Sequence, residues 1–465
     1  MTARASVEVD ATDPGPALYR PRSRAKSPGF LACSSWPVHR WTAGTFFITW
    51  STCCPHPAQV VLPHWSHVVV LHIVLPLVGR RPLSAEPVHH IPPGVYGEAM
   101  KTIIIGGVAA GMSAATRLRR LDEDAHIVVL ERGPHVSFAS CGLPYHVGGV
   151  IEDRQSLLLQ TPASLASRFA LDVRVEHEVL DIDTTAKTVT VRETTTGALS
   201  VEDYDALVLA AGSSPTSRGS AGGVPWHTLR TVQDVDHVND VLASSDGPAH
   251  AVVVGGGFIG VEAVENLLAR DARITLVQRG EQIFGPLDPE MVHPVVEALR
   301  AAGVEIVTGT TVTSTGPGRV ELSDGSSRRA DLVVDASGVS PEATLARRAG
   351  IALGPSGGIA VDGQQRTSDP SVWAAGDGVE KIDAVTAEPT LVTMAGLANR
   401  HGRAVADSIH GIQAPDARPA LGTSIVGVLG ITVATVGWNE KRLVAAGRPH
   451  RAVPTHPPSH AGDFP

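Results

Sequence analysis

The sequence predicts an α/β fold made of two similar units, in each of which a buried strand runs into a glycine-rich turn and then a helix. The first unit starts with the apolar run 101–105 and the second with the apolar run 251–254, and glycines follow both runs directly. Strand, glycine turn and helix in this order are typical of dinucleotide-binding domains. We therefore expect two Rossmann-like domains, the first interrupted by the second, and a truncated α+β domain at the C-terminus.

The composition excludes several classes of protein. The chain has 465 residues, of which 43% are hydrophobic and 18% are charged, so it can bury more than one core. Its net charge of −9 argues against a nucleic-acid partner. Only Cys141 of the four cysteines follows residue 99, which leaves no disulfide framework and suits a reducing cytoplasm. Cysteines and histidines lack the spacing of metal ligands, so we expect no metal.

Residues 1–99 do not have the pattern of a domain. They combine Pro, Arg, His and Trp without helical or strand periodicity. Their most apolar part, residues 66–79, is shorter than the roughly 20 residues of a membrane-spanning helix. The composition changes at Met100, where a buried strand begins at once. We expect the native protein to start at Met100, with residues 1–99 as translated upstream sequence, and we expect no membrane anchor.

The first glycine turn predicts a pyrophosphate site. Gly106, Gly107 and Gly111 allow the backbone to approach a phosphate, whose charge then meets the start of the next helix. Val108 takes the place of the middle glycine in the G-x-G-x-x-G pattern. The next strand ends in Glu131, which is placed to bind a ribose. The cofactor-binding residues predicted for this unit are Gly106, Gly107, Ala110, Gly111, Glu131 and Arg132.

Cys141 is the one cysteine of the main body of the chain. It precedes Gly142 and Pro144, and a proline in this position predicts a helix that starts beside the thiol. The positive end of a helix favours the thiolate, which is the nucleophilic form of cysteine. The alternative is an inert buried cysteine. The position of Cys141 after a dinucleotide-binding unit favours a redox role.

Two stretches, 106–115 and 137–145, resemble the pyridine nucleotide-disulfide oxidoreductases, and within them the single-cysteine branch of coenzyme A-disulfide reductases and NADH oxidases. Members with two cysteines carry C-x-x-x-x-C, and His146 stands at the second cysteine position. The resemblance implies FAD, NAD(P)H and a homodimer, with Cys141 cycling through a mixed disulfide with coenzyme A or through a sulfenic acid. Peroxidase and oxidase members place a histidine where this chain has Ala109. The absence of this histidine favours the mixed disulfide over the sulfenic acid.

The resemblance also implies a surface near the cysteine that binds the phosphates and pantetheine of coenzyme A. Ser140 stands where this branch commonly has asparagine. Each candidate is also an ordinary type of surface or helix-face residue, so the alternative is that it has no ligand. The predicted substrate-binding residues are Arg117, Arg120, Ser137, Phe138, Ser140, Asn399 and Arg403.

The second glycine turn fills all three positions of the pattern with Gly255, Gly257 and Gly260. The resemblance places Glu262, on the following helix, near the nicotinamide. The next strand ends in Gln278 and Arg279, where NADH-using members usually carry an acidic residue for the ribose 2′-hydroxyl. A neutral residue followed by arginine permits a 2′-phosphate, so the sequence favours NADPH over NADH.

Three further residues are predicted to contact a cofactor. The segment 207–215 resembles the A-T-G segment of the family, with Gly212 as its glycine. Gly338 ends the second unit. The segment 372–377 resembles the second flavin motif, in which Asp377 accepts a hydrogen bond from the ribitol chain.

We therefore expect a cytoplasmic, FAD-dependent reductase of a disulfide or persulfide, with coenzyme A disulfide as the preferred candidate. The alternatives are an NADH oxidase or peroxidase that uses a Cys141 sulfenate, and a non-catalytic flavin-binding protein. Residues 421–443 alternate as the strands of an interface domain. The predicted domains are a non-domain extension at 1–99, FAD-binding parts at 100–215 and 338–415, an NAD(P)H-binding domain at 216–337 and a truncated dimerisation domain at 416–465.

Overall fold

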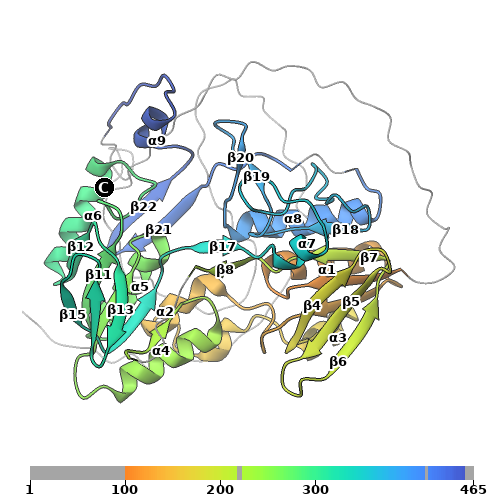
Figure 1. The fold of residues 1–465 in the computed structure, drawn as a ribbon, viewed down its shortest axis with the longest axis horizontal. Coiled ribbons are helices and arrows are strands. Elements are labelled where there is room, and N and C mark those ends of the chain that lie inside the picture. The colour runs from red at the N-terminus through yellow and green to blue at the C-terminus, as the bar shows by residue number, and fades with distance from the viewer. Residues whose placement is uncertain (1–99, 217–222, 414–416, 456–465) are drawn as a thin grey trace, which may run out of the picture. The chain divides into compact units, whose positions relative to one another are not determined.

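The computed structural model describes residues 100–216, 223–413 and 417–455 (Figure 1). The predictions made for residues 1–99 lie outside this part of the chain. Within it the predicted α/β fold is confirmed, because two parallel sheets are covered by helices. None of the helices in these ranges is both long and apolar enough to cross a membrane.

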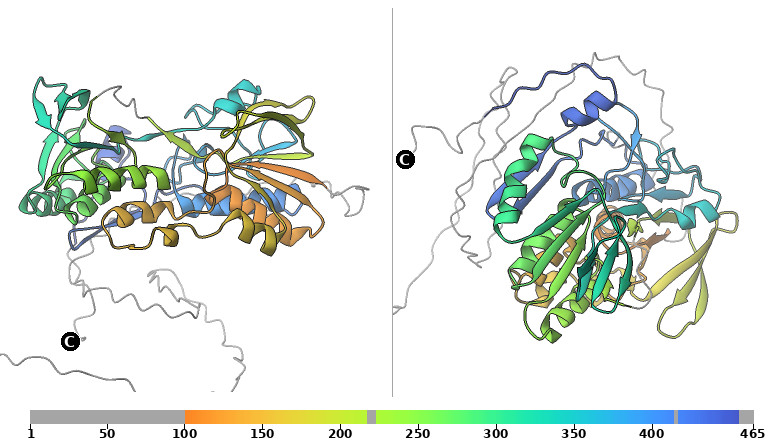
Figure 2. Two further views of the ribbon diagram at one scale, coloured as in Figure 1. Left: turned by 90° about the horizontal axis from the view of Figure 1, so that it is seen from below. Right: turned by 60° about the vertical axis from the view of Figure 1, so that its left-hand side comes forward.

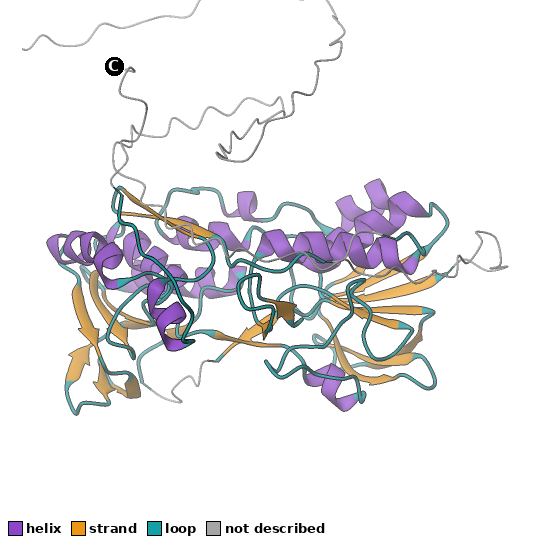
Figure 3. Cartoon of the chain, turned by 90° about the horizontal axis from the view of Figure 1, so that it is seen from above, coloured by secondary structure: helices purple, strands orange, loops and turns teal. Residues whose placement is uncertain are grey.

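The helices are shown in purple in Figure 3. Two of them start with a capping box. The side chain of Thr161 accepts a hydrogen bond from the backbone amide of Ser164, and the side chain of Ser164 accepts one from the backbone amide of Thr161. Thr231 and Asp234 are paired in the same way. The longer helices are α1 (Ala109–Leu121), α3 (Pro162–Phe169), α4 (Val232–Ser244), α5 (Phe258–Leu268), α6 (Pro289–Ala301) and α8 (Ala395–Ile409). The shorter elements are the 3₁₀ turns η1 (Ser140–Gly142) and η2 (Arg154–Leu157) and the helices α2 (Leu143–Val147), α7 (Thr344–Arg348) and α9 (Glu440–Ala445).

The first sheet is parallel, with the strand order β18-β7-β1-β2-β3. β18 belongs to it although the whole second sheet lies between β7 and β18 in the sequence. Short strands rich in Val, Ile and Leu are typical of a sheet that is buried on both faces. The strands are β1 (Lys101–Ile105), β2 (His126–Leu130), β3 (Asp172–Arg174), β7 (Ala206–Leu209) and β18 (Val372–Ala374).

Successive side chains of β1 point to opposite faces of this sheet. Ile104 belongs to a core that α1, α3 and α8 share. Ile103 and Ile105 belong to a second core, shared with α7 and with an antiparallel sheet. The strands of that antiparallel sheet are β4 (His177–Asp183), β5 (Thr188–Glu193) and β6 (Leu199–Asp203).

The second sheet repeats this plan, with the order β12-β11-β10-β16-β9 (Figure 2). One face shares a core with α4, α5 and α6, and a three-stranded sheet covers the other. The parallel strands are β9 (Trp226–His227), β10 (His250–Val254), β11 (Arg273–Gln278), β12 (Glu305–Thr308) and β16 (Leu332–Asp335). The covering strands are β13 (Val312–Gly316), β14 (Arg319–Leu322) and β15 (Ser327–Arg329).

Short antiparallel pairs complete the described chain. The pair β8 (Ser213–Pro215) and β17 (Val339–Pro341) joins the segment that leaves the first sheet to the segment that returns to it. The other pairs are β19 (Lys381–Ile382) with β20 (Pro389–Thr390), and β21 (Ser424–Val428) with β22 (Ile431–Thr435).

The prediction of strands across residues 421–443 was wrong at its end, because α9 begins at Glu440. The side chain of Asn439 accepts a hydrogen bond from the backbone amide of Arg442 at 3.2 Å and so caps this helix. Leu443 fits the alternating pattern of a strand, but it is a buried residue of α9. An N-cap asparagine is a strong local signal for a helix start, and it outweighs a few residues of apparent alternation.

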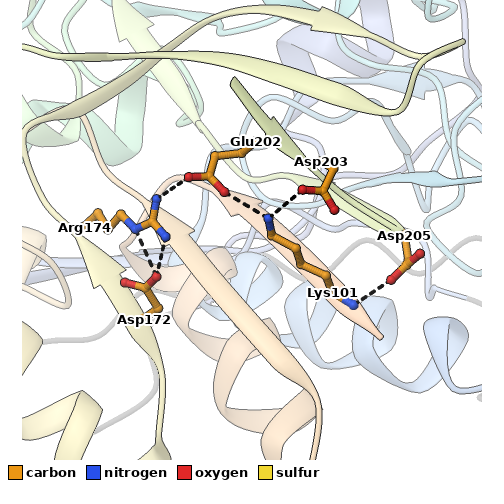
Figure 4. Close-up of polar contacts among 6 residues, drawn as sticks. All are labelled: Lys101, Asp172, Arg174, Glu202, Asp203 and Asp205. Carbon is orange, nitrogen blue, oxygen red and sulfur yellow. Dashed lines mark hydrogen bonds and ion pairs between the residues drawn. The ribbon is translucent and has the colours of Figure 1, made fainter. Parts of the chain in front are cut away.

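Ion pairs between charged side chains link β1, β3 and β6 (Figure 4). Lys101 Nζ lies 2.9 Å from Glu202 and 3.1 Å from Asp203. Arg174 pairs with Asp172 at 2.6 Å and with Glu202 at 2.7 Å. Arg174 and then Lys101 hold the pKa of Glu202 below its usual value. Each such pair contributes about 1 kcal/mol or less, so the network fixes how β1, β3 and β6 meet more than it stabilises the fold.

α1 and α8 lie side by side in the first core (Figures 1 and 3). They approach most tightly at Gly402, where a Cβ would lie 2.2 Å from the carbonyl oxygen of Ala110. Ala110 is in the first turn of α1, directly after the glycine turn. The packing of α8 therefore sets the position of the glycine turn.

We expect Gly402→Ala to force α8 away from α1 and to lower the free energy of unfolding by about 1–3 kcal/mol, the usual effect of overpacking. Denaturant unfolding measures this change. The matched control is Gly396→Ala in the same helix, where nothing lies within 4 Å of the added Cβ. Equal stability of the two variants would contradict the close contact.

Candidate nucleotide and thiol site

The two glycine turns have the same geometry. Gly106 and Gly255 have φ values of +106° and +102°, and a Cβ on either would lie 2.4 Å from a carbonyl oxygen after the neighbouring strand. A Cβ on Gly111 or Gly260 would lie 1.9 Å or 1.8 Å from the carbonyl oxygen of the first glycine of its turn. Side chains are excluded at all four positions, so the start of each helix closes against the end of its strand.

The strand next to each turn braces it with a different side chain. Glu131, after β2, accepts hydrogen bonds from Gly107 N and from a second backbone amide, at 2.8 Å and 2.9 Å. Gln278, at the end of β11, accepts one from Gly256 N at 2.8 Å. Arg279 follows it and is exposed. The first turn is therefore bordered by a carboxylate, and the second by a neutral amide and a cation.

Other predicted cofactor residues lie around these turns. Gly257 is the N-cap of α5 with open space around it, whereas Val108 takes the N-cap position of α1. Ala110 is buried in the first turn of α1. Gly338 precedes β17 and accepts a hydrogen bond from Thr216 N at 3.1 Å. The N-cap of α5 thus has no side chain, whereas the N-cap of α1 carries a valine side chain.

Cys141 is an exposed free thiol in the turn η1, just before α2. The segment before it is fixed to the first glycine turn, because Ser137 N donates to Gly107 O at 2.8 Å. Phe138 packs against the core of the second sheet, and Ser140 is exposed beside the thiol. These three neighbours of the cysteine were predicted as substrate residues, and the structure keeps them on one segment with it.

The helix after the cysteine is anchored in the second core. Leu143 and Val147 of α2 are buried among residues of α4 and α5. Arg270 donates to the carbonyl oxygen of Val147 at 2.8 Å, and a Cβ on Gly148 would lie 2.2 Å from Asn266 Oδ1. The thiol therefore lies on a segment that contacts the first glycine turn on one side and α5 on the other.

Two carboxyl groups of α5 lie near this segment. The Tyr145 hydroxyl hydrogen-bonds to Glu262, and burial, followed by the charges of Glu262 and Glu265, raises the pKa of Tyr145. Burial, and then the neighbouring Glu265, raise the pKa of Glu262 to about 7. Burial also raises the pKa of Glu265, which accepts a hydrogen bond from Leu429 N at 2.7 Å. Glu262 was predicted from the resemblance, whereas Tyr145 was not, because its role depends on a contact between α2 and α5, which are far apart in the sequence.

Asp377 lies on the turn after β18, where Ser213 Oγ donates to it at 3.4 Å. Arg230 reaches the same place, and its guanidinium lies 3.8 Å from the Cβ position of Gly212. Burial lowers the pKa of Arg230. The charge of Asp377 raises this pKa, and the charge of Arg132 lowers it further. Sequence analysis missed Arg230, because no motif marks it and only the fold brings it to this turn.

Comparison with known proteins gives the family. The family described as pyridine nucleotide-disulphide oxidoreductase matches residues 100–396, more than half of the chain. The chain belongs to this family. A coenzyme A disulfide reductase from Staphylococcus epidermidis is 29% identical over 365 residues, which cover 78% of this chain and 82% of the relative.

Solved structures of the family have the same fold. The reduced CoADR-RHD of Bacillus anthracis is 43% identical, with a TM-score of 0.73, over 76% of this chain and 64% of that chain. A NAD-dependent persulfide reductase from A. fulgidus is 34% identical, with a TM-score of 0.71, over 75% of this chain and 66% of that chain. This chain thus spans about two thirds of the length of each of these structures.

As a pyridine nucleotide-disulfide oxidoreductase, the chain is an FAD-dependent enzyme that uses NAD(P)H. The residues at the first turn fit FAD, because Gly106, Gly107 and Gly111 carry no side chains that would keep a phosphate away from the start of α1. The start of α1 can hold the diphosphate, and Glu131, which already accepts a hydrogen bond from the amide of Gly107, has further lone pairs for a ribose. Asp377 and Arg230 can hold the middle of the dinucleotide.

The other residues that were predicted to bind coenzyme A lie on α1 and α8 of this oxidoreductase. Arg117 pairs with Asp407 at 2.8 Å, and Asn399 accepts a hydrogen bond from a serine of α1 at 2.9 Å. Arg120 and Arg403 are exposed. Among the hydrogen bonds and ion pairs of the described residues, none joins this group to Cys141.

We expect Glu262→Gln to remove a pH dependence from the stability of the oxidoreductase. The pKa of this acid is raised on folding, so its ionisation destabilises the fold as the pH rises from about 4.5 to about 7. At pH 5 the variant should match the wild type, and at pH 8 it should be more stable by about 2 kcal/mol, a value reduced for partial solvent screening.

Denaturant unfolding at pH 5 and pH 8 measures this difference. The control is Glu297→Gln, an exposed carboxylate on α6. An E262Q variant that loses as much stability between the two pH values as the wild type would show that Glu262 is ionised at both.

Proposed function

We propose that this flavoenzyme reduces a small disulfide or persulfide, with coenzyme A disulfide as the preferred substrate, through Cys141. The observation that carries the proposal is the exposed thiol held between the first glycine turn and α5. Bound FAD supplies the chemistry of accepting hydride from NAD(P)H and delivering two electrons to a disulfide. His146 stands at the position of a second cysteine, and its ring nitrogen lies 2.6 Å from the carbonyl oxygen of Ile151.

Cys141 must therefore take its disulfide partner from the substrate. Its thiolate attacks one sulfur of the substrate disulfide, a Cys141–sulfur bond forms, and the sulfur–sulfur bond of the substrate breaks. One thiol leaves after gaining a proton. Two electrons and a second proton then cleave the mixed disulfide, which releases the second thiol and restores the Cys141 thiolate.

The nearby acid cluster supports this cycle. Glu262 retains a proton at neutral pH more readily than an ordinary glutamate and is hydrogen-bonded to Tyr145, which lies four residues after Cys141 on the same segment. A departing thiolate needs a proton, and this pair can hold one close to it. The names of the S. epidermidis and B. anthracis relatives support coenzyme A disulfide as the substrate.

We expect Cys141→Ser to abolish reduction of coenzyme A disulfide while NAD(P)H still reduces the bound flavin. Stopped-flow absorbance follows both half-reactions. The control is a triple variant with serine at the other three cysteines, Cys33, Cys53 and Cys54, which should keep full activity. Continued reoxidation of the flavin by coenzyme A disulfide in C141S would contradict the proposal. Reoxidation by oxygen or peroxide alone in the wild type would favour an oxidase.

We also propose that NADPH is the preferred coenzyme. Gln278 removes the carboxylate that would repel a 2′-phosphate, and the exposed Arg279 adds a cation beside it. The A. fulgidus relative is named NAD-dependent, so the two coenzymes must be compared directly.

A Gln278→Asp, Arg279→Ala variant should shift the ratio of kcat/KM for NADPH over NADH by at least tenfold toward NADH, because each change is worth about 1 kcal/mol of phosphate binding. Steady-state kinetics with both coenzymes measures it. Arg273→Ala, at the other end of β11, is the control. A wild-type preference for NADH that the double variant leaves unchanged would exclude this role.

A further inference from the structure

Two buried titratable side chains beside the Asp377 turn take no part in the chemistry above. Lys381 opens β19 and is 7% exposed, and His401 lies in α8 and is 5% exposed. Lysine and histidine are seldom buried to this degree unless a partner or a function requires it.

The ammonium group of Lys381 is held by carbonyl groups. Its Nζ donates to Gly376 O and to Val379 O, both at 2.7 Å. These two carbonyls bracket Asp377, so Lys381 fastens the turn that carries it. Burial lowers the pKa of Lys381 to about 8, and the charge of Asp377 opposes this shift. The third N–H of the ammonium has no hydrogen bond among those of the described residues.

His401 lies one helical turn after Ala398 in α8, and a Cβ on Gly376 would lie 3.9 Å from the Cβ of Ala398. The Nδ1 of His401 is buried and has no hydrogen-bond partner within the described chain. Burial, and then the charges of Lys381 and Arg400, lower the pKa of His401 to about 4, so its ring is neutral. An unpartnered buried nitrogen normally costs free energy, which suggests that this place is completed by a group bound there.

The turn also abuts the start of α1. A Cβ on Gly376 would lie 3.1 Å from the Cβ of Ala110. The turn that Lys381 holds is therefore next to both α8 and the place where α1 leaves the first glycine turn, which is the part of the fold that fits FAD. Asp377 is the charged group that acts on Lys381, and Lys381 and Arg400 are those that act on His401.

We propose that Lys381 and His401 are positioning residues that couple uptake of a proton to reduction of the bound flavin. This inference rests on the flavoenzyme assignment and not on the identity of the disulfide. The two electrons arrive with hydride from NAD(P)H. The added negative charge favours the ammonium form of Lys381, so a proton from solvent moves onto the amine of Lys381 wherever that amine is neutral before reduction.

The test is the two-electron midpoint potential of the FAD-loaded full chain, measured against reference dyes from pH 6 to 9.5. In the wild type the potential should fall more steeply with pH above pH 8, because reduction by two electrons then takes up one extra proton. That is a tenfold change in the equilibrium constant per pH unit, or about 30 mV. Lys381→Met should lower the potential below pH 8 and remove the extra slope.

Two further variants keep the test decisive if K381M binds FAD poorly. Lys381→Arg keeps the charge at every pH, so it should keep the potential below pH 8 and lose the extra slope above it. His401→Gln should keep the slope and move the pH at which it starts. Lys441→Met, on α9, is the control and should match the wild type. Potentials of K381R and H401Q that superimpose on the wild type at all pH values would overturn the proposal.

The same titrations in a C141S background separate this inference from the proposed substrate. A pH-dependent slope that persists in C141S supports the role of Lys381, even if no disulfide reoxidises the flavin. A slope that disappears with Cys141 and is insensitive to Lys381 assigns the proton to the thiol instead and overturns the inference.

Discussion

The segment from Ser137 to Val147 is anchored on both sides, and the chemistry of the site depends on this. The amide of Ser137 is bonded to the first glycine turn, and Leu143 and Val147 are buried against α4 and α5. Because close-packed cores yield little, the thiol between these anchors keeps its place relative to both turns. The electron transfer to the sulfur that we propose depends on this segment holding its position.

Burial sets the pKa values of the groups that hold protons. Glu262 keeps a raised pKa because it is removed from water beside Glu265. Lys381 is held by carbonyls beside Asp377, where burial lowers its pKa. A carboxylic acid that holds its proton and an ammonium that readily releases one are the two kinds of group that a cycle of thiolates and hydride transfer requires. Both result from the way α5 and α8 pack.

The local part of this design could be predicted from the sequence. Glycines after a buried strand require a particular turn, and the structure gives Gly106 and Gly255 matching φ values. Arg230 and the contact of Tyr145 with Glu262 could not be predicted, because their partners are far away in the sequence. Lys381 was missed for a different reason: its partners Gly376 and Val379 are near it in the sequence, but no sequence pattern shows that its side chain folds back onto the Asp377 turn.

The most direct test of the account is the mass of the Cys141 peptide after the resting protein is treated with coenzyme A disulfide. A mixed disulfide should add the mass of one coenzyme A less two hydrogens, at Cys141 and at no other cysteine. NAD(P)H should then remove it and release coenzyme A thiol in equal amount. A Cys141 that stays a free thiol under these conditions, or that carries only added oxygen, would contradict the account.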